Sequence, residues 1–74
     1  MAEKLEIIAG IIEEVTDIPK EDISVESKII DDLDISSLEL MSITSEIGRK
    51  FSVKIPEKAI LDFETIGDII SFLG

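Results

Sequence analysis

Two adjacent serines and a nearby carboxylate, Ser36, Ser37 and Glu39, are the residues whose spacing best suits chemistry. A serine hydroxyl becomes a catalytic nucleophile when a neighbouring base takes its proton, and the chain contains neither His nor Cys. Ser37 therefore cannot be an activated nucleophile in this chain. An exposed serine among carboxylates is instead suited to modification by another enzyme. We accordingly expect a protein that is not an enzyme and has no catalytic residue of its own.

The same residues also form a signature for the start of a helix. In a capping box, the Ser36 hydroxyl accepts from the backbone N–H of Glu39, and the Glu39 side chain accepts from the N–H of Ser36. Ser36 is then the N-cap, and Ser37 is the first helical residue, with its hydroxyl free and facing solvent. Two serines that only cap a helix are the alternative interpretation, because such boxes are common.

The acidic residues before this helix start raise the question of a metal site. Asp32, Asp34 and Ser36 alternate like the first three ligands of an EF-hand calcium loop. The sixth position of such a loop needs Gly and is Ser37 here, and the twelfth needs a bidentate Glu and is Ile43. We therefore expect a solvated acidic loop and no metal site. Of the functional hypotheses that the sequence allows, a calcium-responsive protein is the weakest.

Apolar periodicity and capping residues predict the elements that carry these side chains. A helix is expected over 3–15, where Leu5, Ile8, Ile12 and Val15 form one stripe, and it should stop before Pro19. A long loop with no sustained period follows over 18–35. Further helices are expected from Ser37 to about Phe51, over 57–61, and after a second capping box at 65–68.

These elements predict an all-α fold, a small bundle of three or four helices with a long loop between the first two. Residues 1–74 should form a single domain, since the chain is long enough for only one core. The expected core is Leu5, Ile8, Ile12, Val15, Ile43, Ile47, Phe51, Ile55, Ile66, Ile69, Ile70 and Leu73. The loop should be anchored to it by Ile23, Val25, Ile29, Ile30 and Leu33.

Charge and hydropathy exclude several classes of partner. The formal net charge is −10, and residues 1–39 hold 12 acidic and 3 basic side chains. Such a surface repels nucleic acid and favours basic protein partners. No apolar run approaches the length of a membrane span, and the start of the chain lacks the features of a signal peptide. We expect a cytoplasmic monomer that contacts neither membrane nor nucleic acid.

The run from Asp32 to Leu38, D-L-D-I-S-S-L, resembles the D-L-G-x-D-S-L motif of acyl carrier proteins. Phe51 followed by Ile55-Pro56 resembles the family's F-x-x-x-I-P, and Thr65-Ile66 resembles the T-V that opens its last helix. The resemblance implies that Ser37 carries a 4′-phosphopantetheine arm, installed from coenzyme A by a phosphopantetheinyl transferase. Acyl intermediates would travel on that arm as thioesters between acyl-transfer or synthase enzymes that have basic docking surfaces.

Two residues depart from the family motif. Its Gly is Asp34 here, and the Asp before its modified serine is Ser36. Asp tolerates left-handed backbone geometry better than most residues, and Ser caps a helix as well as Asp does. The lost charge beside Ser37 predicts less efficient modification by a housekeeping transferase. Asp32, Asp34 and Ser36 are therefore the residues expected to decide transferase recognition.

The second helix should present a partner-binding face. With Ile43, Ile47 and Phe51 turned inward, Leu38 and Met41 fall on the outer face. We expect Leu38, Glu39, Met41 and Glu46 to contact partner enzymes. Glu39 and Glu46 are offset by Arg49 and Lys50, so the partners should belong to a specialised fatty-acid, polyketide or related pathway. The alternative is a carrier-like adaptor or regulatory module that is never modified.

Overall fold

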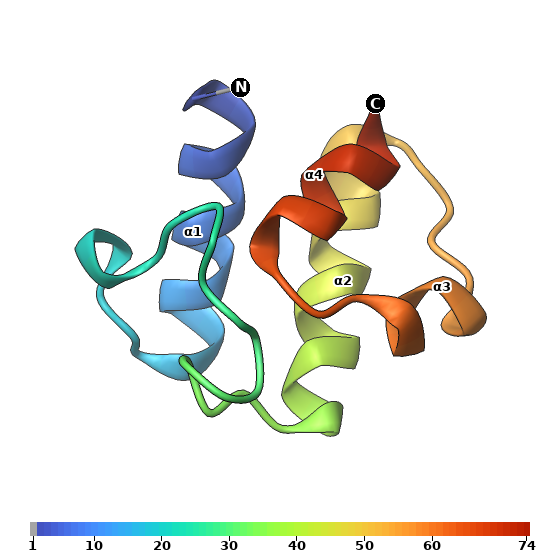
Figure 1. Ribbon diagram of the computed structural model, residues 1–74. Coiled ribbons are helices and arrows are strands. Elements are labelled where there is room, and N and C mark those ends of the chain that lie inside the picture. Colours follow the sequence, from blue (N-terminus) through green and yellow to red (C-terminus); the bar gives the residue numbers. More distant parts are fainter. Residues whose placement is uncertain (1) are drawn as a thin grey trace.

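The computed structural model describes residues 2–74, which form four α-helices and one short 3₁₀ helix (Figure 1). In chain order they are α1 (Ala2–Thr16), η1 (Lys20–Asp22), α2 (Ser37–Phe51), α3 (Glu57–Asp62) and α4 (Ile66–Leu73). No strand is present in this part of the chain, so the predicted all-α bundle with a long first loop is confirmed.

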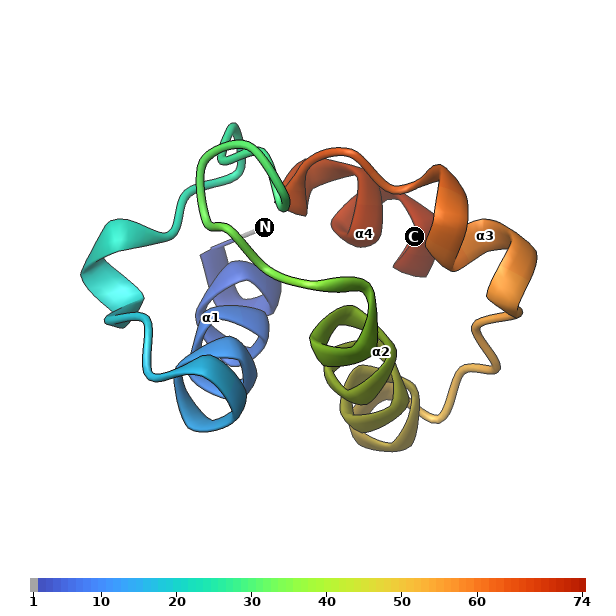
Figure 2. The ribbon, with the colours of Figure 1, turned by 90° about the horizontal axis from the view of Figure 1, so that it is seen from below.

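The helices are arranged around the antiparallel pair of α1 and α2. In Figure 1, α1 runs downward and α2 runs upward beside it. Figure 2 shows α4 on one side of this pair, with α3 next to α2. The start of α2, and with it Ser37, therefore lies at the opposite end of the bundle from the C-terminus.

The first loop is more ordered than its lack of periodicity indicated. Asp17, with φ of 68°, ends α1 in the left-handed region, two residues before Pro19. The single turn of η1 follows, and from there the chain returns to the core. Its backbone pairs with the start of α4, where Ile66 donates to the Ser27 carbonyl at 3.1 Å and Gly67 donates to that of Val25 at 2.9 Å. The loop is thus held in place by backbone hydrogen bonds that join distant parts of the sequence.

The end of α2 depends on a glycine. Ser52 has φ of 55°, and the N–H of Val53 donates to the carbonyl of Gly48 at 2.9 Å, which closes the helix. A Cβ placed on Gly48 would lie 2.7 Å from the carbonyl oxygen of Val53. Gly48 appears in the sequence only as a loss of helix propensity, whereas in the fold it admits the returning chain.

The fourth helix starts with the predicted capping box. Thr65 Oγ1 accepts from the N–H of Asp68 at 3.2 Å, and Asp68 Oδ2 accepts from the N–H groups of Glu64 and Thr65 at 2.9 and 3.1 Å. These backbone N–H donors, that of Glu64 first, hold the pKa of the Asp68 carboxyl below its ordinary value. The ionised carboxylate of Asp68 therefore stabilises the start of α4.

Most of the predicted core is buried. Ile8, Ile12, Ile43, Ile47, Ile66, Ile69 and Ile70 are buried, and Leu5, Val15, Phe51, Ile55 and Leu73 are partly buried and pack against them. The core also includes residues outside that prediction, namely Ala9, Ile35, Leu40 and Ile60, together with the loop anchors Ile23, Ile29 and Leu33.

For two of the five residues expected to anchor the loop, the prediction is wrong. Val25 is 36% exposed and Ile30 is 60% exposed, so neither belongs to the core. Ile30 stands beside the fully buried Ile29, whose N–H donates to the carbonyl of Glu64 at 2.9 Å. This bond fixes which of the two neighbours turns inward.

The two ends of the described chain meet. Lys4 Nζ donates to the carbonyl of Gly74 at 2.8 Å, which joins the first turn of α1 to the end of α4. None of the helices in residues 2–74 combines the length and the apolar character needed to cross a membrane.

Candidate functional site

The start of α2 has the geometry that the sequence predicts. Ser36 Oγ accepts from the N–H of Glu39 at 3.2 Å, and Glu39 Oε1 accepts from the N–H of Ser36 at 2.9 Å. Ser37 is the first helical residue and is exposed. Among residues 2–74, no hydrogen bond engages its hydroxyl, so the oxygen is free to react with a group supplied from outside.

The position of Ser37 suits a phosphate. The first N–H groups of a helix lack partners within the helix, and the helix dipole makes this end electropositive. In α2 the box satisfies the N–H of Glu39, while the turn that carries Ser37 remains open to solvent. The residues present therefore fit a phosphodiester on the Ser37 oxygen.

The acidic loop before the helix is shaped by its aspartates. Asp32 Oδ2 accepts from the N–H of Lys28 at 2.8 Å, which closes the turn that leads into the site. Asp34 has φ of 54°, the left-handed conformation that favours Gly. The backbone thus adopts the geometry expected for the motif's glycine, although an Asp occupies the position. Both carboxylates lie in exposed residues.

The predicted partner face is exposed, but its members differ. Leu38 is 82% exposed and Met41 is 40% exposed, so both apolar side chains are open to solvent. Glu39 is half-buried and holds the helix cap, while Glu46 is exposed and forms an ion pair with Arg49 on the next turn. The carboxylates expected to contact partners therefore already have intramolecular bonds.

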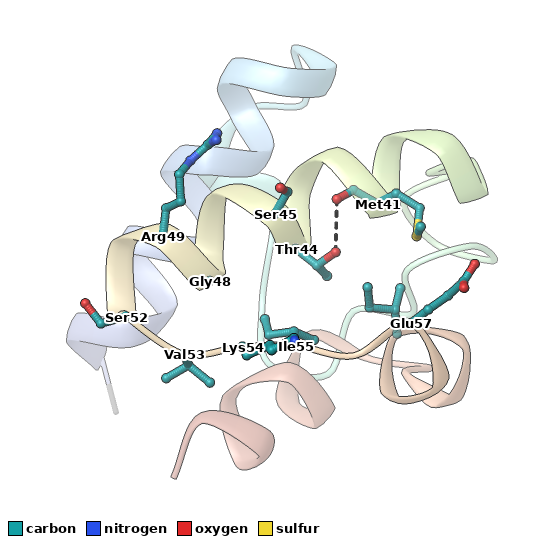
Figure 3. A pocket seen from close by; sticks show the side chains of 11 residues that line it. Met41, Thr44, Ser45, Gly48, Arg49, Ser52, Val53, Lys54, Ile55 and Glu57 are labelled. Atoms are coloured by element: carbon teal, nitrogen blue, oxygen red, sulfur yellow. Dashed lines mark hydrogen bonds between the residues drawn. The ribbon is translucent and has the colours of Figure 1, made fainter.

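An open groove runs along α2 on the side of α3, and the sequence did not indicate it (Figure 3). The groove lies between α2 and the segment from Ser52 to Ile60, and its volume is about 510 Å³. Figure 3 shows Thr44 and Gly48 facing the extended chain at Val53 and Ile55. We call it the α2–α3 groove. The groove could not be predicted because the sequence does not show that the chain after α2 returns to contact Gly48.

Thr44 is the buried polar residue of this groove. Its hydroxyl lies 2.9 Å from the carbonyl oxygen of Leu40 and 3.1 Å from that of Met41, to which it donates. Because the hydroxyl is satisfied by the backbone of its own helix, Thr44 can be buried among apolar neighbours without an unpaired donor.

The acidic loop does not gather metal ligands. In the part of the chain that the structure describes, no three side chains of the types His, Cys, Asp or Glu are arranged to hold a metal ion. The Asp32 carboxylate bonds to the backbone of its own turn, as described above.

Comparisons with known proteins agree with this geometry. Residues 6–73 match the family model described as "Phosphopantetheine attachment site". The chain is 40% identical over 75 residues to the meromycolate extension acyl carrier protein of Mycolicibacterium aurum, covering 97% of this chain and 77% of that protein. It is 42% identical over 71 residues to the protein of the same name from Mycobacterium leprae, of which it spans only 62%.

A solved structure shares the fold. The acyl carrier protein of Enterococcus faecalis superposes with a TM-score of 0.77 at 26% identity, over 97% of this chain and 91% of that one. The similarity therefore extends along the whole helical bundle and includes the segment that carries Ser36 and Ser37.

Proposed function

Because the chain belongs to the acyl carrier protein family, whose members bear a covalent 4′-phosphopantetheine, we propose that Ser37 is the residue that carries this group. The observation that carries the proposal is the exposed Ser37 at the first position of α2, with its hydroxyl outside the capping box that engages Ser36. Of the two adjacent serines, only Ser37 has an uncommitted oxygen.

In the covalent step a phosphodiester forms on Ser37 while the pyrophosphate linkage of coenzyme A breaks. The Ser37 oxygen bonds to the phosphorus that bears the pantetheine of coenzyme A, and the bond from that phosphorus to 3′,5′-ADP breaks. The hydroxyl proton passes to a base of the transferase, since within residues 2–74 no group accepts a hydrogen bond from the Ser37 hydroxyl. When bound, the group supplies a terminal thiol that holds an acyl chain as a thioester, which this Cys-free chain cannot do alone.

The chain is thus a carrier of acyl groups for other enzymes. We propose that it catalyses no step itself and meets its transferase and its acyl-transfer or synthase enzymes as a monomer in the cytoplasm. Residues 1–74 would act as one domain. The net charge of −10 supports basic docking surfaces on those enzymes.

The partner face is best described as an apolar pair within an acidic surface. Leu38 and Met41 are solvent-exposed one turn apart on α2, and burying them against an enzyme would add affinity. Asp32, Asp34 and Ser36 lie on the approach to Ser37, where they support a role in transferase recognition. Glu39 and Glu46 would contribute charge while keeping their present bonds.

The α2–α3 groove supports a second part of the proposal, a shelter for the acyl chain (Figure 3). Met41, Ile55 and Ile60 provide apolar lining, and the hydroxyl of Thr44 is turned to its own helix backbone. An acyl chain lying along these residues would be partly removed from water.

The relatives support a specialised pathway. Two of them are named meromycolate extension acyl carrier proteins, and they are longer than this chain. We propose that the chain likewise serves an extension pathway for long lipid chains. The presence of Arg49 and Lys50 near the end of α2 supports dedicated partner enzymes.

The test is the intact mass of the protein before and after incubation with coenzyme A, Mg²⁺ and a broad-specificity phosphopantetheinyl transferase. We expect a gain of one phosphopantetheine in the wild type and in Ser36→Ala, and none in Ser37→Ala. A gain that persists in Ser37→Ala would overturn the assignment of the site. No gain with several transferases, on folded protein, would favour the unmodified adaptor.

A further inference from the structure

A second hollow lies away from α2, where the loop before α2 meets the segment that follows α3. It encloses about 370 Å³. Its walls are Lys28, Ile30 and Asp31 on the loop, Leu61 in α3, and Phe63, Glu64 and Thr65 after it. None of these residues lines the α2–α3 groove. We call this site the loop–α3 hollow.

The walls of the loop–α3 hollow are fixed by the fold. The N–H of Ile29 donates to the Glu64 carbonyl at 2.9 Å, and Lys28 forms an antiparallel bridge with Thr65. The ring of Phe63 stands edge to face against Phe72, with centroids 5.8 Å apart. A partner would therefore meet a surface that is already formed, and little ordering would oppose binding.

Two large apolar side chains at this hollow are open to water. Ile30 is 60% exposed and Leu61 is 73% exposed, although their neighbours Ile29 and Ile60 are buried. The core is therefore complete without them, and the fold does not explain their apolar character. Exposed apolar side chains gathered around a concave site are typical of a binding surface.

The charges around the loop–α3 hollow indicate the chemistry of the partner. Asp31 and Glu64 place two carboxylates on its lining against the single ammonium of Lys28, and the chain as a whole carries −10. A complementary surface would present an apolar side chain flanked by Lys or Arg.

The position of the hollow indicates which partner enzyme binds there. The same loop leads from Ile30 through Asp34 directly into Ser37, so the hollow and the modified serine belong to one continuous stretch of chain. An enzyme that modifies the Ser37 hydroxyl must lie against α2 and this loop.

We infer that the loop–α3 hollow is a docking site for the phosphopantetheinyl transferase, which inserts an apolar side chain flanked by basic residues. Ile30 and Leu61 bind that side chain, and Asp31 and Glu64 attract the flanking cations. The inference rests on the proposed modification of Ser37 and adds a contact region outside the α2 face of Leu38 and Met41.

The test is the kinetics of phosphopantetheine transfer from coenzyme A with Mg²⁺, over a range of carrier concentrations, with two transferases of different specificity. The variants are Leu61→Asn and Ile30→Asn, each checked for a native amide spectrum. Val25→Thr is the control, because Val25 is exposed but lines a different hollow beside α4. For each apolar-to-Asn change we expect KM for the carrier to rise about tenfold at an unchanged kcat, with the control unaltered.

The outcomes separate this inference from the proposed function. Wild type that gains the group at Ser37, together with variants whose KM is unchanged, would overturn the docking site alone. Normal transfer in the variants combined with poor thioester loading would assign the hollow to later enzymes and also overturn the inference. Wild type that is never modified would overturn both proposals.

Discussion

The N–H of Ile29 donates to the carbonyl of Glu64 at 2.9 Å, and this bond joins the loop before α2 to the segment before α4. It is reinforced by the bonds from Ile66 to Ser27 and from Gly67 to Val25. The approach to Ser37 is therefore braced by the last helix, which is remote in sequence. A change at the start of α4 should be felt at the site.

The cap of α2 offers the first prediction. Ser36→Ala removes the hydroxyl that accepts from the N–H of Glu39, so the protein should lose about 1 kcal/mol of unfolding free energy. Ser36→Asp should keep the cap and restore a negative charge beside Ser37. Urea denaturation measures the first effect. We expect Ser36→Asp to be modified faster than the wild type, and equal rates would show that this charge is unimportant.

The glycines of α1 and α2 should respond oppositely to the same substitution. A Cβ at Gly48 would lie 2.7 Å from the Val53 carbonyl oxygen, whereas one at Gly10 meets only the Lys20 side chain at 4.0 Å. Gly10→Ala should therefore gain up to about 1 kcal/mol of stability, and Gly48→Ala should lose stability. Thermal unfolding of both variants compares them directly. Stabilisation by both would mean that the end of α2 can relax.

Asp34 should be strained by its own side chain. Its φ of 54° costs a non-glycine residue roughly 1 kcal/mol, less for Asp than for most others. Asp34→Gly should accordingly stabilise the fold by a few tenths of a kcal/mol or more. Asp31→Gly is the matched control. Asp31 has a negative φ, so its replacement by Gly relieves no strain and only raises the conformational entropy of the unfolded chain, which destabilises the fold. Denaturant midpoints of the two variants should move in opposite directions.

Asp68 should make stability depend on pH in the acid range. Its folded-state pKa is lowered by the N–H groups of Glu64 and Thr65, so its stabilising contribution is present above the unfolded-state pKa. That contribution is lost as the pH falls through the lowered value. Asp68→Ala should thus melt below the wild type at neutral pH, and the gap should close in strong acid. A gap that stays constant with pH would exclude the charged form as its cause.

The helices and the cap at Ser36 were predictable because their signals are local. Apolar spacing defines α1 and α2, and the two capping boxes mark the starts of α2 and α4. The free hydroxyl of Ser37 followed from the same local argument.

What could not be predicted depends on contacts between distant segments. The loop has no period, so nothing in the sequence showed that Ile29 turns inward and Ile30 outward. In the sequence Gly48 is only a weak position in a helix, because the approach of Val53 to it depends on how the chain folds back. The α2–α3 groove and the loop–α3 hollow both form where segments distant in the sequence meet, and such contacts leave no periodic pattern in the residues.

The bond from Lys4 to the Gly74 carbonyl places both ends of the described chain at the end of the bundle opposite Ser37 (Figure 1). A tether attached near either end would therefore orient the molecule with its reactive serine pointing away from the support. Immobilised on a sensor or displayed on a particle, the protein would present Ser37, Leu38 and the acidic loop to every enzyme in solution.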